Sequence, residues 1–261
     1  MYQDIKVERS GAVVIIVLSR PHRLNALTTR MLAEVEHAVL AAVEERARAI
    51  LLTGEGQFFS VGTDMEPDGD AYTGLTDDLG AVLEQRANPL MKLLADLPMP
   101  LVCSVNGPAI GAAVGLALMG DLLVMGQRSY LQLAQVGVGL VPDTGATWLV
   151  ARSMGRARAM QMALFGERLG ANEAKAAGIA ASVMPDSFVR SEALALASRL
   201  AEGPTRAMGA IRRQINYAMD HDLADVLAFE AEQQRACGRT QDFAAARAAL
   251  GSRKRTLFIG Q

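Results

Sequence analysis

The chain has little of what marks several large classes of protein. Its 261 residues include 5% aromatics, two cysteines and three histidines, and its formal net charge is −2. Without a basic excess, the sequence argues against nucleic acid as the main partner. Cys103 and Cys237 lie far apart without a motif spacing, which favours reduced thiols over a disulfide framework.

Signals for export and for membrane insertion are also missing. Residues Met1–Arg9 are polar and charged, unlike a signal peptide. No uninterrupted apolar run reaches the length that spans a bilayer, because even Leu116–Met125 is cut by Gly120 and Asp121. We therefore expect a cytoplasmic protein without a membrane partner.

What the sequence does contain is an alternating α/β pattern followed by a helical third. One helix is expected after a cap at Thr28 or Thr29 and another over Leu79–Leu97. From Ala157 onward the chain is predicted to be nearly all helical. The predicted strands are Ile5–Arg9, Val13–Leu18, Ala49–Thr53, Leu101–Val105 and Leu122–Met125.

The most informative stretch is Val102–Asp121, where an apolar strand breaks at Asn106-Gly107-Pro108 and small residues follow. This order predicts a strand, a tight loop and the start of a buried helix, whose unpaired N–H groups suit an anion or an oxyanion. Tight helix packing through Gly and Ala explains the same residues equally well. A second loop of small residues, Gly54–Asp64, also follows a strand, whereas the acidic stretch Pro67–Asp78 has no period and is expected to be mobile.

Five motifs follow one another along the chain: Pro21-x-x-x-Asn25-Ala26-Leu27, Phe59–Met65, Val105–Ala113, Gly139–Gly145 and the tail Arg253–Phe258. In this order they resemble the crotonase (enoyl-CoA hydratase/isomerase) superfamily. The stretch Gly139–Arg152 is similar to an isomerase branch of this family that acts in phenylacetate degradation. The resemblance implies an α/β crotonase spiral of ββα units over residues 1–200 and a C-terminal helical trimerisation region over 201–261.

The resemblance also implies an acyl-CoA thioester substrate and a homotrimer or a dimer of trimers. Coenzyme A would enter as part of the substrate, with no separate cofactor and no metal. Carried over by position, the thioester oxygen would be bound by the backbone N–H groups of Thr63 and Ala112. Two fixed dipoles of this kind suit a developing enolate. Residues implied to contact the substrate are Arg23, Leu24, Ala26, Gly62, Asp64, Met65, Gly111, Gln135, Arg253, Lys254 and Arg255.

Arg23 and the tail cluster Arg253-Lys254-Arg255 are the candidates for pairing with CoA phosphates, since a guanidinium binds phosphate bidentately. A solvated basic surface is the alternative for each of them. The chain departs from the family at the two glutamates of the hydratases, because Gly115 and Gln135 stand in their places. Hydration needs a base and an acid, so ordinary hydratase activity is not expected.

Asp143 is the remaining candidate for acid–base chemistry. A single carboxylate suits a double-bond shift, in which it removes a proton and returns it two carbons away. We expect Val141 and Trp148 to be apolar neighbours that raise its pKa. The alternative is that Asp143 caps the following helix.

Several functions stay open on the sequence. The substrate of an isomerase would be a 3-enoyl-CoA, a dehydroadipyl-CoA or a ring epoxide of an aryl-acetyl-CoA. Weak hydration, another enolate reaction and non-catalytic binding of CoA esters are the alternatives. Dehalogenation through Asp143 is disfavoured, because Leu79–Leu97 holds no histidine to act as a base.

Overall fold

The computed structural model describes residues 2–65, 78–251 and 256–261. The candidate contacts Arg253, Lys254 and Arg255 lie outside the described residues, as does most of the acidic stretch Pro67–Asp78. Within the described parts of the chain, none of the helices combines the length and apolar character needed to cross a bilayer.

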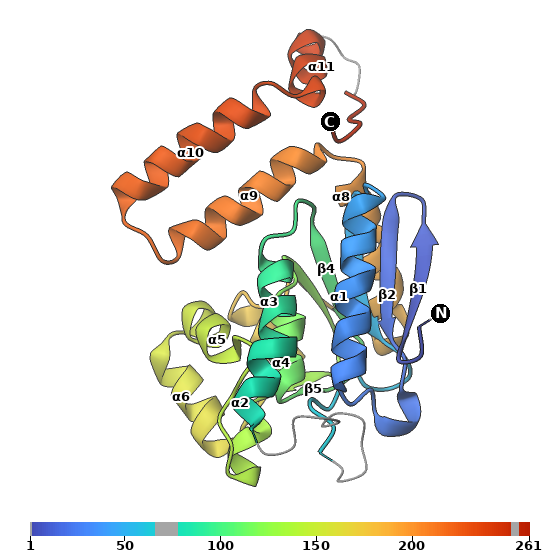
Figure 1. Ribbon diagram of the computed structural model, residues 1–261, viewed down its shortest axis with the longest axis vertical. Coiled ribbons are helices and arrows are strands. Elements are labelled where there is room, and N and C mark those ends of the chain that lie inside the picture. The colour runs from blue at the N-terminus through green and yellow to red at the C-terminus, as the bar shows by residue number, and fades with distance from the viewer. Residues whose placement is uncertain (1, 66–77, 252–255) are drawn as a thin grey trace.

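A six-stranded sheet forms the centre of the described structure (Figure 1). Its strands in spatial order are β1 (Ile5–Ser10), β2 (Val13–Leu18), β3 (Ala49–Gly54), β4 (Leu101–Val105), β6 (Leu122–Gly126) and β9 (Ser182–Met184). β1 and β2 form an antiparallel hairpin, and every other neighbouring pair is parallel. The strands predicted from the sequence are therefore confirmed to within one residue at their ends.

The parallel strands are mostly apolar because both faces of the sheet are covered. Alternate residues of β2 therefore point to opposite faces of the sheet. Ile16 and Leu18 pack with α1 (Thr29–Glu44) and α3 (Asn88–Ala95), whereas Ile15 and Val17 pack against α8 (Val189–Ala201). Three of the buried residues on the contact face of α8 are alanines, Ala193, Ala197 and Ala201, which lets that helix lie close to the sheet.

The two helices predicted in the first half are confirmed. Thr28 caps α1, since its hydroxyl accepts a hydrogen bond from the Met31 N–H at 2.9 Å. The run predicted over Leu79–Leu97 consists of α2 (Leu79–Val82), a π-helical turn (Leu83–Ala87) and α3. Turns of this kind are frequent at functional sites.

The prediction of a nearly all-helical region after Ala157 is wrong at two places. β8 (Arg168–Gly170) pairs with β7 (Tyr130–Gln132), and β9 extends the large sheet beside β6. Each of these strands has three residues, too few to show an alternating pattern in the sequence. β5 (Ala109–Ile110), β7 and β8 form a second sheet, and the helices around it are α4 (Ala112–Leu118), α5 (Ala146–Met154), α6 (Arg156–Phe165) and α7 (Ala171–Ala176).

Three helices form an arm at one end of the molecule (Figure 1): α9 (Thr205–Ala218), α10 (Leu223–Cys237) and α11 (Gln241–Ala249). α9 and α10 lie against each other, joined by the stacked rings of Tyr217 and Phe229. The Arg212 guanidinium fastens α9 to the body through Asp121, at 2.8 Å. The domain boundary after residue 200 and the trimerising role of this arm stay predictions.

Candidate active site

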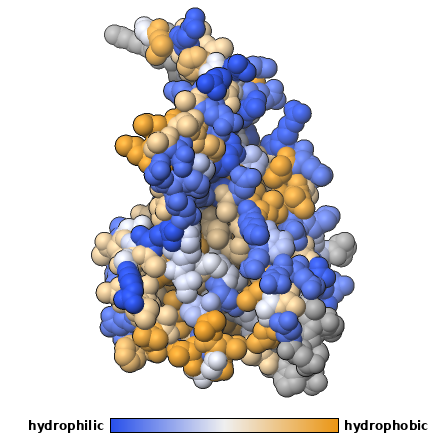
Figure 2. Space-filling view, turned by 60° about the vertical axis from the view of Figure 1, so that its left-hand side comes forward, coloured by the Kyte–Doolittle hydropathy of each residue, from blue (hydrophilic) through white to orange (hydrophobic). Residues whose placement is uncertain are grey.

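A cavity of about 630 Å³ opens at the end of the molecule opposite the arm. Its walls come from the start of α1, the loop 61–65, the helical run 79–88, the loop 110–112 and the segment 134–147. Most lining residues are apolar, and exposed Val138 and Val141 lie at the same end, where Figure 2 shows apolar surface along the lower edge. Among the described lining residues Asp143 alone is charged.

The two glycine-bearing loops meet at one wall of this cavity. Leu27 and Thr63 form a parallel bridge, in which the Leu27 N–H donates to Gly62 O at 2.8 Å and the Asp64 N–H donates to Leu27 O at 3.0 Å. These bonds turn the Thr63 N–H to the other side of the strand. Ala112 is the first residue of α4, and no described residue accepts a hydrogen bond from its N–H or from that of Thr63.

The close approach of the loops depends on Gly62. Its φ is +86°, and a Cβ at this position would lie 2.5 Å from Ile110 O and 3.2 Å from Ala112 N. Any side chain would therefore push the second loop away. The structure brings the two candidate oxyanion donors, Thr63 and Ala112, to one cavity, as the sequence predicted.

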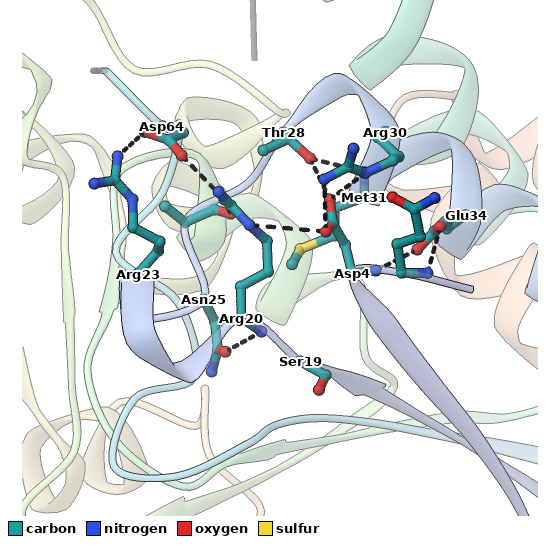
Figure 3. A network of polar contacts seen from close by, with 12 residues as sticks. Asp4, Ser19, Arg20, Arg23, Asn25, Thr28, Arg30, Met31, Glu34 and Asp64 are labelled. Carbon is teal, nitrogen blue, oxygen red and sulfur yellow. Dashed lines mark hydrogen bonds and ion pairs between the residues drawn. The ribbon is translucent and has the colours of Figure 1, made fainter. Parts of the chain in front are cut away.

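A network of buried charges fixes the residue next to Thr63 (Figure 3). The Asp64 carboxylate is 2% exposed and accepts from Arg20 Nη1 at 3.0 Å and from Arg23 Nη2 at 3.0 Å. Arg20 also donates to Ala26 O at 2.7 Å and lies 3.8 Å from Asp4. The network thus ties the loop 62–64 to the segment 20–26 and to Asp4, the residue before β1.

This network places several predicted substrate contacts. Arg23 and Asp64 pair with each other, Ala26 is buried, and Leu24 is exposed in a left-handed conformation with φ +52°. Leu24 and Ala26 do not line the cavity, whereas the predicted contacts Met65, Gly111 and Gln135 do. The sequence did not reveal that Arg20 forms a buried ion pair with Asp64, because nothing in a polar loop indicates which arginine is buried.

Asp143 also lines this cavity and is half-buried. Its Oδ1 accepts a hydrogen bond from Gln135 Nε2 at 3.1 Å. Burial raises the pKa of the Asp143 carboxyl, while hydrogen bonds from Gln135 and Thr144 oppose that rise. A buried carboxyl that stays ionised without a cation beside it is a stronger base than an exposed one.

One alternative for Asp143 and one prediction about its surroundings are wrong. The cap of α5 is Gly145, so the Asp143 side chain does not serve as the helix N-cap, although its carbonyl accepts from the Ala146 N–H at 2.9 Å. Trp148 is not a neighbour of the carboxyl, because it lines a different cavity beside α9 and lies under the Arg152 guanidinium, 4.4 Å away. Thr147, one residue earlier on the helix, faces the site instead.

Gly115 has a steric reason to be glycine here. A Cβ on Gly115 would lie 2.2 Å from Thr144 O and 2.3 Å from Thr144 Oγ1. The turn that carries Asp143 therefore rests directly on α4, and the Thr144 hydroxyl donates to Ala112 O at 2.8 Å. Thr144, which the sequence did not single out, links the carboxyl side of the site to the oxyanion side.

These features agree with the family comparison. The model of the enoyl-CoA hydratase/isomerase family matches residues 8–257. This chain therefore belongs to that family, the crotonases, and the predicted crotonase fold is confirmed by solved structures.

Individual relatives are named for different activities. A protein named 1,2-epoxyphenylacetyl-CoA isomerase, from Escherichia coli K12, is 38% identical over 95% of both chains. A protein named probable enoyl-CoA hydratase, from Rhodobacter capsulatus, is 38% identical over 93% of this chain and 92% of its own. An enoyl-CoA hydratase structure from Geobacillus kaustophilus superposes with a TM-score of 0.90 at 31% identity, covering 100% of this chain and 99% of that one.

Proposed function

We propose that this chain isomerises an unsaturated or epoxidised acyl-CoA thioester, with Asp143 as the group that moves the proton. The carrying observation is the composition of the cavity: one carboxyl and two backbone N–H groups for which no described residue is an acceptor, in walls whose other described residues are uncharged. The similarity to the E. coli isomerase supports the same reaction class.

For a 3-enoyl-CoA the reaction balances with these groups alone. The Asp143 carboxylate takes a proton from the carbon between the thioester and the double bond, and the electron pair moves to the thioester oxygen. The N–H groups of Thr63 and Ala112 stabilise that oxygen as the dienolate forms. Protonated Asp143 then returns the proton two carbons away, which leaves the double bond conjugated with the thioester. Coenzyme A takes part only as a portion of the substrate.

The walls also favour some substrates over others. A carboxylate-ended acyl group such as dehydroadipyl would meet Asp143 and no cation among the described lining residues. Burying an unpaired charge is strongly unfavourable. We therefore favour an uncharged aliphatic or aromatic acyl group.

Hydration is the second candidate because several relatives are named hydratases. It needs a base for water and an acid for carbon. Gly115 supplies no side chain, and its place is closed to a glutamate by Thr144. The side-chain amide of Gln135 does not gain or lose a proton near neutral pH, so it cannot serve as the acid or the base. We therefore expect hydration to be weak.

The test uses two substrates with the purified protein. With a 3-enoyl-CoA, growth of the ultraviolet band of the conjugated thioester without a change in mass reports isomerisation. With a 2-enoyl-CoA, loss of that band with a mass gain of one water reports hydration. The proposal expects the first reaction to be much faster. A faster second reaction contradicts it, and binding of both esters without turnover favours a non-catalytic binding protein.

We also propose that the arm assembles the chain into a homotrimer or a pair of trimers. Apolar side chains on it are exposed in the single chain, among them Ile211, Ile215, Leu223 and Leu227. Exposed apolar patches of this kind mark protein contacts. Light scattering on the purified protein measures the assembly, and a monomer would contradict this proposal.

A further inference from the structure

Gln135 is buried beside the proposed base in an unusual hydrogen-bonding state. The residue is 9% exposed and lies on the 3₁₀ turn Ala134–Val138, where its backbone carbonyl accepts from the Leu140 N–H at 3.0 Å. Its Nε2 bonds Asp143 Oδ1, whereas its Oε1 is buried without a hydrogen-bond partner among the described residues.

The chemistry of the pair determines which end of the amide faces Asp143. An ionised carboxylate only accepts hydrogen bonds, so the NH₂ group must be the end that faces it. The amide oxygen is then left unpaired in the interior, which is unfavourable. A glutamine that only filled space would be replaced without loss by an apolar side chain. The contact with Asp143 is therefore the feature that accounts for an amide at this position.

We propose that Gln135 is a positioning residue that anchors Asp143 through Oδ1 and leaves Oδ2 to carry the proton. This inference rests on the proposed isomerisation. The Nε2–H···Oδ1 bond holds the plane of the carboxyl in both halves of the reaction, because Oδ1 is an acceptor whether or not Oδ2 bears a proton. One oxygen thus takes the proton from one carbon and delivers it to the other.

The same bond favours the ionised carboxyl. The groups that face Asp143 are the Gln135 amide and the Thr144 hydroxyl, and no other titratable side chain lines the cavity in the described chain. Without the amide, the effect of burial on the pKa of Asp143 is opposed only by its own backbone N–H and by Thr144. Loss of the amide is therefore expected to move the acidic limb of the pH–rate profile to higher pH.

Two variants and a matched control test this role. Gln135→Leu keeps the approximate volume and removes the donor. Gln135→Glu offers an O–H donor while the two carboxyls share one proton. The control is Gln132→Leu, since Gln132 is also a partly buried glutamine but donates to Gly166 O at 2.8 Å, outside the cavity.

For Gln135→Leu we expect kcat to fall about 10- to 100-fold, the range of one hydrogen bond to a charged group. KM should stay within about twofold, as for a contact that matters in the chemical step. Gln135→Glu should recover activity at pH values where the two carboxyls share one proton. At higher pH that proton is lost, so the pH–rate profile should show a new decline on its alkaline side. Gln132→Leu should keep the wild-type profile.

Unchanged kcat and an unchanged acidic limb in Gln135→Leu would overturn the inference. A readout without substrate separates this failure from failure of the proposed function. The pKa of Asp143 can be followed by NMR of ¹³C-labelled aspartate, with Asp143→Asn to assign the signal. Titration at higher pH in Gln135→Leu than in the wild type supports the anchoring, even if the wild type isomerises nothing; identical titration contradicts it.

Discussion

Asp64 is buried in the loop 61–65 and Asp143 is half-buried in the cavity wall, and the surroundings of the two carboxyls differ completely. Asp64 is 2% exposed and held between two arginines, with Arg20 itself nearly buried. Asp143 has an amide and a hydroxyl beside it, and burial raises its pKa. The partners, not the residue type, decide what each aspartate does.

The difference follows from the treatment of charge in a protein interior. A carboxylate paired with cations is fixed in place and serves as a structural link. Burial without a neighbouring cation destabilises the ionised form of a carboxyl. Its pKa is therefore raised, and it binds a proton more readily. Asp64 is therefore suited to hold the Thr63 loop, and Asp143 is suited to exchange a proton.

The largest effect is expected when the structural aspartate is removed. Asp64→Ala leaves Arg20 and Arg23 without their shared carboxylate, and breaking a buried pair typically lowers the free energy of unfolding by about 3–5 kcal/mol. Because the Thr63 N–H loses its support, turnover should fall as well. Chemical denaturation and the rate with a 3-enoyl-CoA measure the two effects.

The matched control for this variant is an exposed pair. Glu8 Oε2 and Arg190 Nη2 lie 2.7 Å apart, and the two side chains are 47% and 49% exposed. Glu8→Ala should change the free energy of unfolding by about 1 kcal/mol or less. Equal losses in the two variants would show that the Asp64 network is not a special support.

A smaller effect is expected where the two sides of the site meet. Gly115→Ala places a methyl group 2.2 Å from Thr144 O, so the turn that carries Asp143 must shift. Overpacking of this kind lowers the free energy of unfolding by about 1–3 kcal/mol. Turnover should fall more than affinity for a CoA ester.

Gly137→Ala is the control, since a Cβ there meets no described atom within 4 Å. It should change stability by about 0.5 kcal/mol or less. If Gly115→Ala behaves like Gly137→Ala, the turn is not held by α4 and its contact does not position Asp143.

The smallest effect concerns stability as a function of pH. Because the folded-state pKa of Asp143 is raised, the folded protein binds this proton more tightly than the unfolded chain does. Wild-type stability therefore declines as the pH rises from the unfolded-state pKa through the folded-state pKa. Asp143→Asn lacks this decline, so its Tm should exceed that of the wild type at neutral pH, by roughly 2 °C. The difference should vanish in acid, and a lower Tm at neutral pH would contradict the assignment.

The sequence predicted the parts of the molecule that depend on local pattern. The strands of the large sheet are apolar runs bounded by turn residues, and the glycine loops follow them directly. β8 and β9 were not predicted, because a strand of three residues is too short to show an alternating pattern of apolar and polar residues. Their pairing also depends on strands that are distant in the sequence. The pairing of Arg20 with Asp64, 44 residues apart, depends on the folded loops in the same way.

Several residues that the sequence singled out line one cavity, but their geometry could not be predicted. Asp143 was identified by its motif, but its relation to Trp148 depended on where α5 begins. A start at Ala146 after Gly145 turns Thr147 to the cavity and Trp148 toward α9. Thr144 lies so close to Gly115 that a Cβ there would be 2.2 Å from Thr144 O, and its φ is +50°. This φ is unusual for a β-branched residue, and no sequence pattern predicts it.

The most direct test of this account compares binding and turnover in Asp143→Asn. Affinity for a non-reactive acyl-CoA and the growth of the conjugated thioester band from a 3-enoyl-CoA are measured for this variant and the wild type. If Asp143 moves the proton, affinity should stay within about threefold, while the rate falls by about 10²- to 10⁴-fold. A variant that forms the conjugated product at the wild-type rate would show that another group carries the proton.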